Sequence, residues 1–218
     1  MPTRQHFDQI LTELTQHIYD MGSLVDQKIG LAIESMKKQD LELANQIIVG
    51  DLEVNELQVT IEEKSILLIA TQQPLATDLR KVIAGFKISI YLERIGDLAV
   101  NLAKITTRIG NEEFIKPLID IPRMGNLVQN MLKTGIKAYV DEDMEASKAM
   151  SLIDDEIDHV YRQIFNELLL LMMQNPRNIT QANHLLFASR NLERMGDYCT
   201  NIGEETVYAV TGKRMDLN

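Results

Sequence analysis

The feature that most constrains the fold of this chain is an internal repeat. Residues 21–25 (Met-Gly-Ser-Leu-Val) recur 103 positions later as residues 124–128 (Met-Gly-Asn-Leu-Val). Residues 92–101 (Leu-Glu-Arg-Ile-Gly-Asp-Leu-Ala-Val-Asn) recur 100 positions later as residues 192–201 (Leu-Glu-Arg-Met-Gly-Asp-Tyr-Cys-Thr-Asn). Halves that match in sequence order are typical of two copies of one structural unit. The sequence therefore predicts a duplicated fold.

Each copy is predicted to be helical. Proline-free stretches carry apolar residues at a helical period, as Ile157, Val160, Ile164 and Leu168 illustrate, and no sustained two-residue alternation indicates strands. Short connections between the stretches favour antiparallel neighbours. We predict an all-α fold of two tandem three-helix bundles, with six long antiparallel helices. The expected helices span about 4–38, 41–71, 75–110, 121–140, 142–174 and 179–211, and the repeats span 1–115 and 116–218.

Composition excludes several classes of function. The formal net charge is −10, and no dense run of lysine and arginine offsets it, which argues against nucleic-acid binding. Cys199 is the single cysteine, so no intrachain disulfide can form, and this fits a reducing compartment. The first ten residues lack a signal-peptide pattern, and the apolar run at 168–173 is too short to span a bilayer. We therefore expect a cytoplasmic protein.

The repeated Leu-Glu-Arg-x-Gly-Asp segment is locally unfavourable for a helix. Glu93 and Asp97 are four residues apart, so like charges share one face at a cost of a few tenths of a kcal/mol. Gly96 in a helix interior costs about 1 kcal/mol relative to alanine. The second copy repeats these choices. A costly pattern that occurs twice indicates a site, although a solvated acidic face with Arg94–Asp97 ion pairs is the simpler interpretation.

Each acidic segment has a predicted partner on the preceding helix. If the helices fold back at Pro74 and Pro176, residues equidistant from each turn lie level. Asp154 and Asp158 then fall beside Asp197 and Glu193, and the first half follows the same count. The predicted quartets are Asp51, Asn55, Glu93 and Asp97 in the first half, and Asp154, Asp158, Glu193 and Asp197 in the second.

Oxygen-donor quartets on facing helices suit a metal ion. Carboxylates favour hard cations such as Mg, Ca and Mn, and also iron, while zinc is possible. Asp78, Asn101, Asn201 and Glu204 are possible additional ligands. Asp78 also lies near an expected helix start, where N-capping is the plain interpretation.

The duplicated segment, the Asp78-Leu79-Arg80 helix start and the paired three-helix layout resemble the PhoU family over nearly the whole chain. The resemblance implies a cytoplasmic, dimer-forming regulator of phosphate uptake. It implies action between the ATPase subunit of a phosphate ABC transporter and a sensor histidine kinase, repressing starvation genes when phosphate is plentiful, with membrane association only through these partners. It also implies multinuclear iron or zinc clusters on the quartets. Asn55 departs from this pattern, and an amide is a poorer ligand, so we expect weaker binding in the first half.

The alternative is a metal-dependent bundle enzyme, either a di-metal carboxylate oxidase or a hydrolase. Glu156-x-x-His159 fits the Glu-x-x-His motif of di-iron bundles, but those need two such motifs and residues 55–58 contain no histidine. Gly-rich nucleotide loops are also absent from the sequence. We therefore predict a regulator that is not an enzyme.

Overall fold

The structure, a computed structural model, describes residues 4–50 and 52–217. This part of the chain contains helices and no strand, in agreement with the predicted all-α class. The helices are α1 (Arg4–Lys38), α2 (Leu41–Val49), α3 (Leu52–Gln72), α4 (Thr77–Ile109), α5 (Asp120–Asp141), α6 (Met144–Gln174), the 3-10 turn η1 (Pro176–Asn178) and α7 (Ile179–Thr211). Within the described ranges, every helix is too short or too polar to cross a membrane.

The repeat is visible in how helices begin. Asp40 caps α2 by accepting a hydrogen bond from the backbone N–H of Leu43. Asp143, 103 residues later, caps α6 by accepting from the N–H groups of Glu145 and Ala146. A side-chain oxygen at this position satisfies amides that have no partner within the helix. The same residue type therefore starts the equivalent helix in both halves.

The first half differs from the second in its middle helix. The stretch 41–71 was expected to form one helix, and this was wrong, because α2 ends at Val49 and α3 begins at Leu52. Gly50 follows α2 as its C-cap. The equivalent position in the second half is Ile153, inside the continuous α6. Glycine is a poor helix former by about 1 kcal/mol, which is the physical reason for a break in one copy alone.

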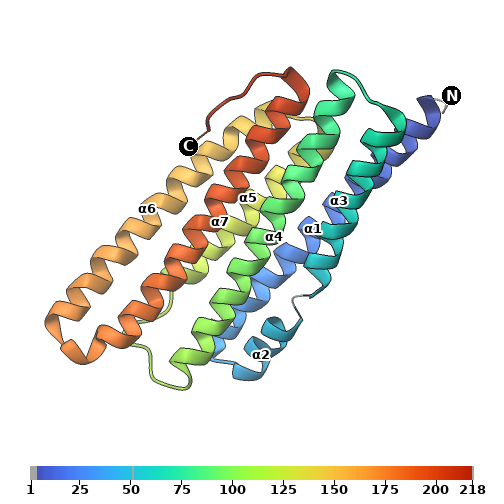
Figure 1. Ribbon diagram of the computed structural model, residues 1–218. Coiled ribbons are helices and arrows are strands. Elements are labelled where there is room, and N and C mark those ends of the chain that lie inside the picture. The colour runs from blue at the N-terminus through green and yellow to red at the C-terminus, as the bar shows by residue number, and fades with distance from the viewer. Residues whose placement is uncertain (1–3, 51, 218) are drawn as a thin grey trace.

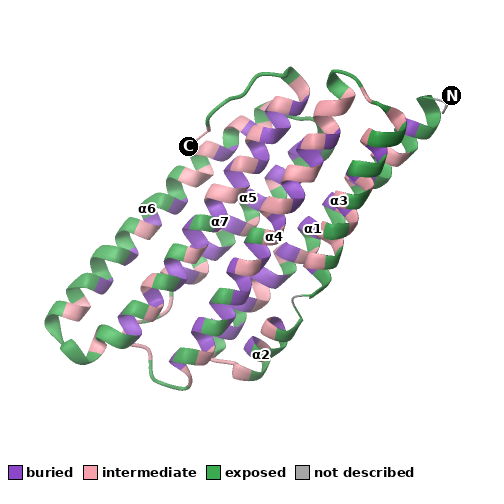
Figure 2. Cartoon of the chain, in the orientation of Figure 1, coloured by how far each residue is buried: buried purple, intermediate pink, exposed green. Residues whose placement is uncertain are grey.

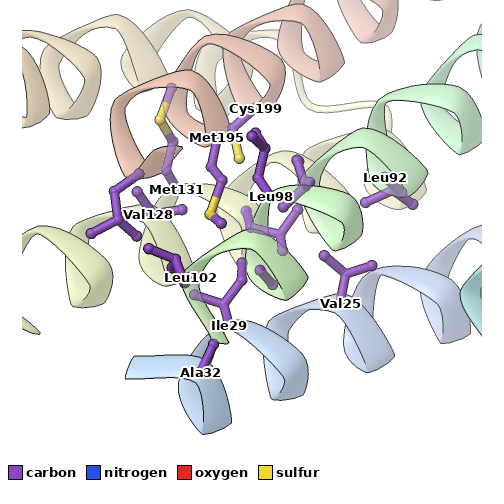
Figure 3. Packing of buried hydrophobic residues seen from close by; sticks show 14 of the residues in the cluster. Val25, Ile29, Ala32, Leu92, Leu98, Leu102, Val128, Met131, Met195 and Cys199 are labelled. Carbon is purple, nitrogen blue, oxygen red and sulfur yellow. The ribbon is translucent and has the colours of Figure 1, made fainter. Parts of the chain in front are cut away.

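The helices form one elongated bundle in which the two halves lie side by side (Figure 1). Helices α1 to α4 pack together, as do α5 to α7, and α4–α7 and α1–α5 contacts join the halves. The buried apolar side chains form a single cluster drawn from both halves (Figure 2). In Figure 3, side chains from α1, α4, α5 and α7 meet in this core. The expected boundary at 115/116 falls in the connection between α4 and α5, and the division into two domains stays a prediction.

The crossing of α1 and α5 is itself symmetric. A Cβ atom added at Gly22 would lie 2.8 Å from Cγ1 of Ile136, and one added at Gly125 would lie 1.9 Å from Cδ1 of Ile33. Gly22 and Gly125 are repeat equivalents, and so are Ile33 and Ile136. Each half therefore inserts the same isoleucine against the same glycine of the other half. The repeated Met-Gly-x-Leu-Val segment marks this close approach.

Candidate functional site

The second-half quartet lies on facing turns of α6 and α7. Helix α6 carries Asp154 and Asp158, and α7 carries Glu193 and Asp197. A Cβ atom added at Gly196 would lie 3.1 Å from Oδ1 of Asp154, so the small residue lets the two helices approach beside the acids. Glu193 is buried, at 9% exposed, and its Oε2 atom has no hydrogen-bond partner. Asp158 is exposed.

The pKa values of Asp154, Glu193 and Asp197 are raised above their ordinary values. Burial raises the pKa of Asp154 to about 6, and the nearby charges of Asp158 and Asp197 add to the shift. Burial, followed by the charge of Asp197, raises the pKa of Glu193 to about 7. The pKa of Asp197 is raised by burial and by Asp158, while Arg190 opposes the shift. Desolvation and like charge both disfavour the ionised forms, so a cation placed here would be stabilised.

Arg190 limits the charge of the second-half quartet, and the sequence analysis did not single it out. Its guanidinium donates to Oε1 of Glu193 and lies over the Tyr161 ring, 5.9 Å from the ring centroid. The spacing of three residues between Arg190 and Glu193 could have indicated this ion pair. The position equivalent to Arg190 in the first half is Ile90, so the pair belongs to one copy.

The first-half site has the same helix register with a different arrangement of charge. A Cβ atom at Gly96 would lie 3.3 Å from Cγ1 of Val54, as one at Gly196 would lie 3.3 Å from Cδ1 of Ile157, the residue equivalent to Val54. The level pairing predicted from the turns is therefore present in both halves. Asn55 is half-buried, and Asp51 lies outside the described residues.

Arg94 occupies the acids of the first-half site. Its Nε atom lies 3.4 Å from Oε2 of Glu93, and its Nη1 atom lies 3.7 Å from Oδ2 of Asp97. The simpler interpretation of the motif, a surface ion pair between Arg94 and Asp97, therefore describes this half. Both halves therefore place an arginine beside the motif glutamate, and they differ in burial: the Glu93 and Asp97 side chains are 24% and 43% exposed, whereas that of Glu193 is 12% exposed.

The four additional candidates are spread along the bundle. Asp78 accepts hydrogen bonds from Arg4, and it lies fifteen residues, or about 22 Å, from Glu93 along α4. It therefore cannot join the first-half quartet, and the expected N-cap was also wrong, because Ala76 precedes α4 as the cap. Glu204 accepts a hydrogen bond of 3.0 Å from the backbone N–H of Leu217. It lies seven residues, or about 10 Å, from Asp197 along α7. Asn101 and Asn201 lie one helical turn beyond Asp97 and Asp197.

The features that would indicate a di-iron enzyme point outward. Glu156 pairs with Arg123 at 2.9 Å, and His159 contacts Gln163, all at exposed positions. A di-iron bundle holds its Glu-x-x-His motifs inside the core. Cys199 is fully buried among apolar side chains (Figure 3), and burial raises the pKa of its thiol, so it is not poised as a nucleophile.

A second buried carboxylate, Glu205, was missed by sequence reasoning. It is 3% exposed, its Oε1 accepts from Lys87 of α4 at 2.7 Å and from Arg214 at 3.4 Å, and its Oε2 has no hydrogen-bond partner. The repeat equivalents of Lys87 and Glu205 are the apolar residues Phe187 and Ile105. Lys87 and Glu205 are oppositely charged residues at positions where the other half has an apolar residue, and this pattern could have indicated the contact between the halves.

The second-half quartet is not a closed coordination sphere as its side chains stand. Among the residues that the structure describes, no three histidine, cysteine, aspartate or glutamate side chains are grouped closely enough to hold a metal ion. The carboxylates are near enough to influence one another's ionisation, and Glu193 is turned toward Arg190. Rotation of these side chains would be needed for several oxygens to reach one ion.

Together, the fold and the sites define a class: a duplicated all-α bundle that carries an acidic motif on α4 in one half and on α7 in the other. The chain belongs to the PhoU family, because the PhoU domain matches residues 18–106 and 121–206. It is 40% identical to a phosphate-specific transport system accessory protein PhoU homolog of Clostridium acetobutylicum, over 99% of both chains. It is 38% identical to a homolog of the same name from Caulobacter vibrioides, over 98% of this chain and 93% of that protein.

Solved structures agree with the fold. The crystal structure of PhoU from Pseudomonas aeruginosa matches with a TM-score of 0.91 and 31% identity, covering 95% of this chain and all of that one. The phosphate transport system regulatory protein PhoU of Streptococcus pneumoniae matches with a TM-score of 0.91 and 30% identity, covering 97% and 100%. The predicted family and fold class are confirmed.

Proposed function

We propose that this protein is a cytoplasmic regulator of inorganic phosphate uptake and of phosphate-starvation signalling. The observation that carries the proposal is the full-length similarity to proteins named as accessory to a phosphate-specific transport system. In this role the protein is an adaptor between the ATPase subunit of a phosphate ABC transporter and a sensor histidine kinase. It keeps starvation genes repressed when phosphate is plentiful, acts as a homodimer, reaches the membrane only through its partners, and is not an enzyme.

We further propose that the second-half quartet binds metal, as iron or zinc clusters, with Mn, Mg or Ca as other possible ions. Two observations support the proposal: Glu193 has a buried oxygen without a hydrogen-bond partner, and the raised pKa values of Asp154 and Asp197 reflect negative charge at this site that no cation compensates fully. A bound cation would neutralise this repulsion and link α6 to α7. Arg190 would have to leave Glu193, which gives the site two states, paired with arginine or loaded with metal.

The adaptor role is tested by deleting the gene and measuring alkaline phosphatase output in high phosphate. We expect derepression, restored to repression by the wild-type gene. Unchanged repression in a strain without a second copy would remove the adaptor role.

The metal requirement is tested separately by pull-down of the transporter ATPase with chelated and metal-loaded protein. Asp154→Asn is the informative variant, and Asp155→Asn, at an exposed neighbouring position, is the matched control. Metal-dependent capture that is lost only in Asp154→Asn supports the adaptor. Phosphate or peroxide turnover by the loaded protein would instead support the enzyme alternative.

A further inference from the structure

The segment that follows α7 folds back onto the helix it leaves. Gly212 ends α7 in the left-handed conformation, with a φ of 71°, and its backbone N–H donates to the carbonyl oxygen of Tyr208. Glycine at this position lets the chain reverse its direction. Residues 212–217 then turn back and run toward α6 (Figure 1). We call these six residues the strap.

Two residues of the strap, three positions apart, contact side chains of α7. The guanidinium of Arg214 lies over the Tyr208 ring, 4.7 Å from the ring centroid, and its Nη1 atom lies 3.4 Å from Oε1 of Glu205. The backbone N–H of Leu217 donates to Oε1 of Glu204 at 3.0 Å. Because Glu204 lies one helical turn before Tyr208, the strap runs along α7 in the direction opposite to the helix.

The side chain of Leu217 lies where α7 has a glycine. A Cβ atom added at Gly203 would lie 3.3 Å from Cδ1 of Leu217 and 3.2 Å from the carbonyl oxygen of Ser147 on α6. The glycine therefore leaves room for an aliphatic side chain beside the contact of α6 with α7, and Leu217 is half-buried there. The residues of α7 that receive the strap are together called the strap site: Gly203, Glu204, Glu205 and Tyr208.

The strap leaves part of the strap site unused. The side chain of Glu205 is 4% exposed, and among the residues that the structure describes its Oε2 atom has no hydrogen-bond partner. Its Oε1 atom already accepts from Lys87 at 2.7 Å, so Arg214 approaches an oxygen that is shared, and the Arg214 side chain stays 66% exposed. Arginine–carboxylate pairs are often bidentate, with N–H groups about 2.7–2.9 Å from both oxygens. A guanidinium that came closer, with a rotation of the carboxyl group, would use both oxygens of Glu205.

The strap is held less firmly than the segment that follows α4 in the first half. That segment accepts and donates backbone hydrogen bonds with the side chains of Gln39 and Gln181. Its Phe114 and Ile115 side chains also pack against the core. Residues 212–216 of the strap are all exposed. Because little burial opposes its release, the strap can leave the surface of α7 without unfolding the bundle.

The strap site belongs to the second half alone. Its repeat equivalents at positions 104, 105 and 108 are lysine, isoleucine and arginine, in place of two glutamates and a tyrosine. A carboxylate beside the face of an aromatic ring binds a cationic side chain, and arginine is the most frequent one. The net charge of −10 also favours a basic partner over an acidic one. The chemistry of the site therefore selects a guanidinium.

We propose that the strap occupies a binding site for an extended, arginine-bearing segment of another protein, and that it must leave for that segment to bind. The segment that fits has an arginine and, three residues later, an aliphatic residue, as the strap has at Arg214 and Leu217. Its arginine would bind Glu205 and the Tyr208 ring, and its aliphatic side chain would lie beside Gly203. A second copy of this chain is a poorer occupant, because exchange of identical straps gains no contact. The proposal concerns a surface outside the acidic quartets and does not depend on the signalling role.

The test is an NMR titration of the ¹⁵N-labelled full chain with an unlabelled peptide that has the sequence of residues 211–218. A strap on so short a tether competes at an effective concentration of roughly millimolar, so the peptide is added to several millimolar. Arg214→Ser in the protein weakens the strap and leaves the strap site intact. This variant should bind the peptide at least about tenfold more tightly than wild type, the factor expected if the wild-type site is open a tenth of the time. Lys213→Ser is the matched control, because it removes the same charge from the neighbouring exposed residue and should bind as wild type does.

Two further measurements identify the contact. A peptide with alanine in place of its arginine should not bind the Arg214→Ser protein. Adding Tyr208→Leu to that protein should weaken binding of the original peptide about two- to fivefold, which is the loss of one exposed cation–π contact. High salt should also weaken binding. A circular dichroism spectrum equal to that of wild type confirms that each variant folds.

Three outcomes overturn the proposal. The first is a peptide that does not bind the Arg214→Ser protein at several millimolar, and the second is equal binding of the arginine and alanine peptides. The third is a loss of self-association in Arg214→Ser but not in Lys213→Ser, measured by sedimentation velocity. That result would show that the strap fills the site of a second copy instead. All three leave the alkaline phosphatase test of the signalling role untouched.

Discussion

Replacing Asp158 by asparagine should stabilise the metal-free protein, and the gain should depend on pH. Asp158 acts on three carboxyl groups at once, because its charge contributes to the raised pKa of Asp154, Glu193 and Asp197. Asparagine is also the residue that the first half has at the equivalent position, Asn55. The variant therefore gives the second-half quartet the same four residue types as the first-half quartet.

The magnitude follows from the number of repulsions removed. A like-charge pair at helical spacing costs a few tenths of a kcal/mol, and three such repulsions at a half-buried site amount to about 0.5–1 kcal/mol at neutral pH and above. The pH dependence of stability is opposite to that of a carboxyl group whose pKa is lowered on folding. Asp154 and Glu193 have raised pKa values of about 6 and about 7, so folding is favoured while they are protonated, and this stability is lost as the pH rises from their ordinary values through 7. In acid, Asp158 therefore faces Asp154 and Glu193 in their neutral forms.

The assay is urea unfolding of chelator-treated protein at about pH 8 and about pH 4.5. Asp158→Asn should raise the free energy of unfolding at the higher pH and change it little at the lower one. Asp155→Asn is the control, because Asp155 is the smallest contributor to the shift of Asp154 and should give a smaller gain. A gain that is equal at both pH values, or a loss of stability at high pH, refutes the repulsive site described here.

Three further predictions concern the core. Gly125→Ala should lower the free energy of unfolding in urea by about 1–3 kcal/mol, because the added Cβ would lie 1.9 Å from Cδ1 of Ile33. The matched control is Gly30→Ala, whose Cβ would meet only the flexible end of Gln129, so this variant should be neutral or stabilising. Similar free energies of unfolding for the two variants would refute the close crossing of α1 and α5. Lys87→Met should cost about 1–3 kcal/mol by leaving buried Glu205 undercompensated, and adding Glu205→Leu should recover most of it; no recovery would show that the loss comes from packing. The Cys199 thiol should react with alkylating reagents only on unfolding, and rapid labelling of the native protein would contradict its burial.

The repeat made much of the fold predictable. The helix pattern, the two copies and the level pairing of the acidic segments follow from spacing alone, since rise per residue is the same on both arms of a hairpin. The break between α2 and α3 was missed because a helical apolar period continues through Gly50. Comparison of the two halves indicates the break, because Gly50 stands where the second half has Ile153.

Part of the site depends on packing that periodicity does not contain. The ion pair between Lys87 and Glu205 exists because α4 and α7 meet across the two halves, and no local pattern reports such a contact. Likewise, the two quartets look alike in sequence, yet burial and repulsion dominate at Asp154, and the arginines differ: Arg94 lies beside Glu93 and Asp97, whereas Arg190 pairs with Glu193. Burial and the positions of the arginine side chains are properties of the folded chain. The sequence therefore located the acidic residues but did not show which of the two sites is the more buried.

The most direct test of the central claim is the metal content of protein that has been stripped with chelator and reloaded with iron or zinc. Wild type is compared with Asp154→Asn in the second-half quartet and with Glu93→Gln in the first. We predict that Asp154→Asn removes most of the bound metal and that Glu93→Gln removes little, because Glu193 is buried with an unpartnered oxygen and lies with Asp154 among like charges. Equal losses in the two variants, or a larger loss in Glu93→Gln, would contradict the account.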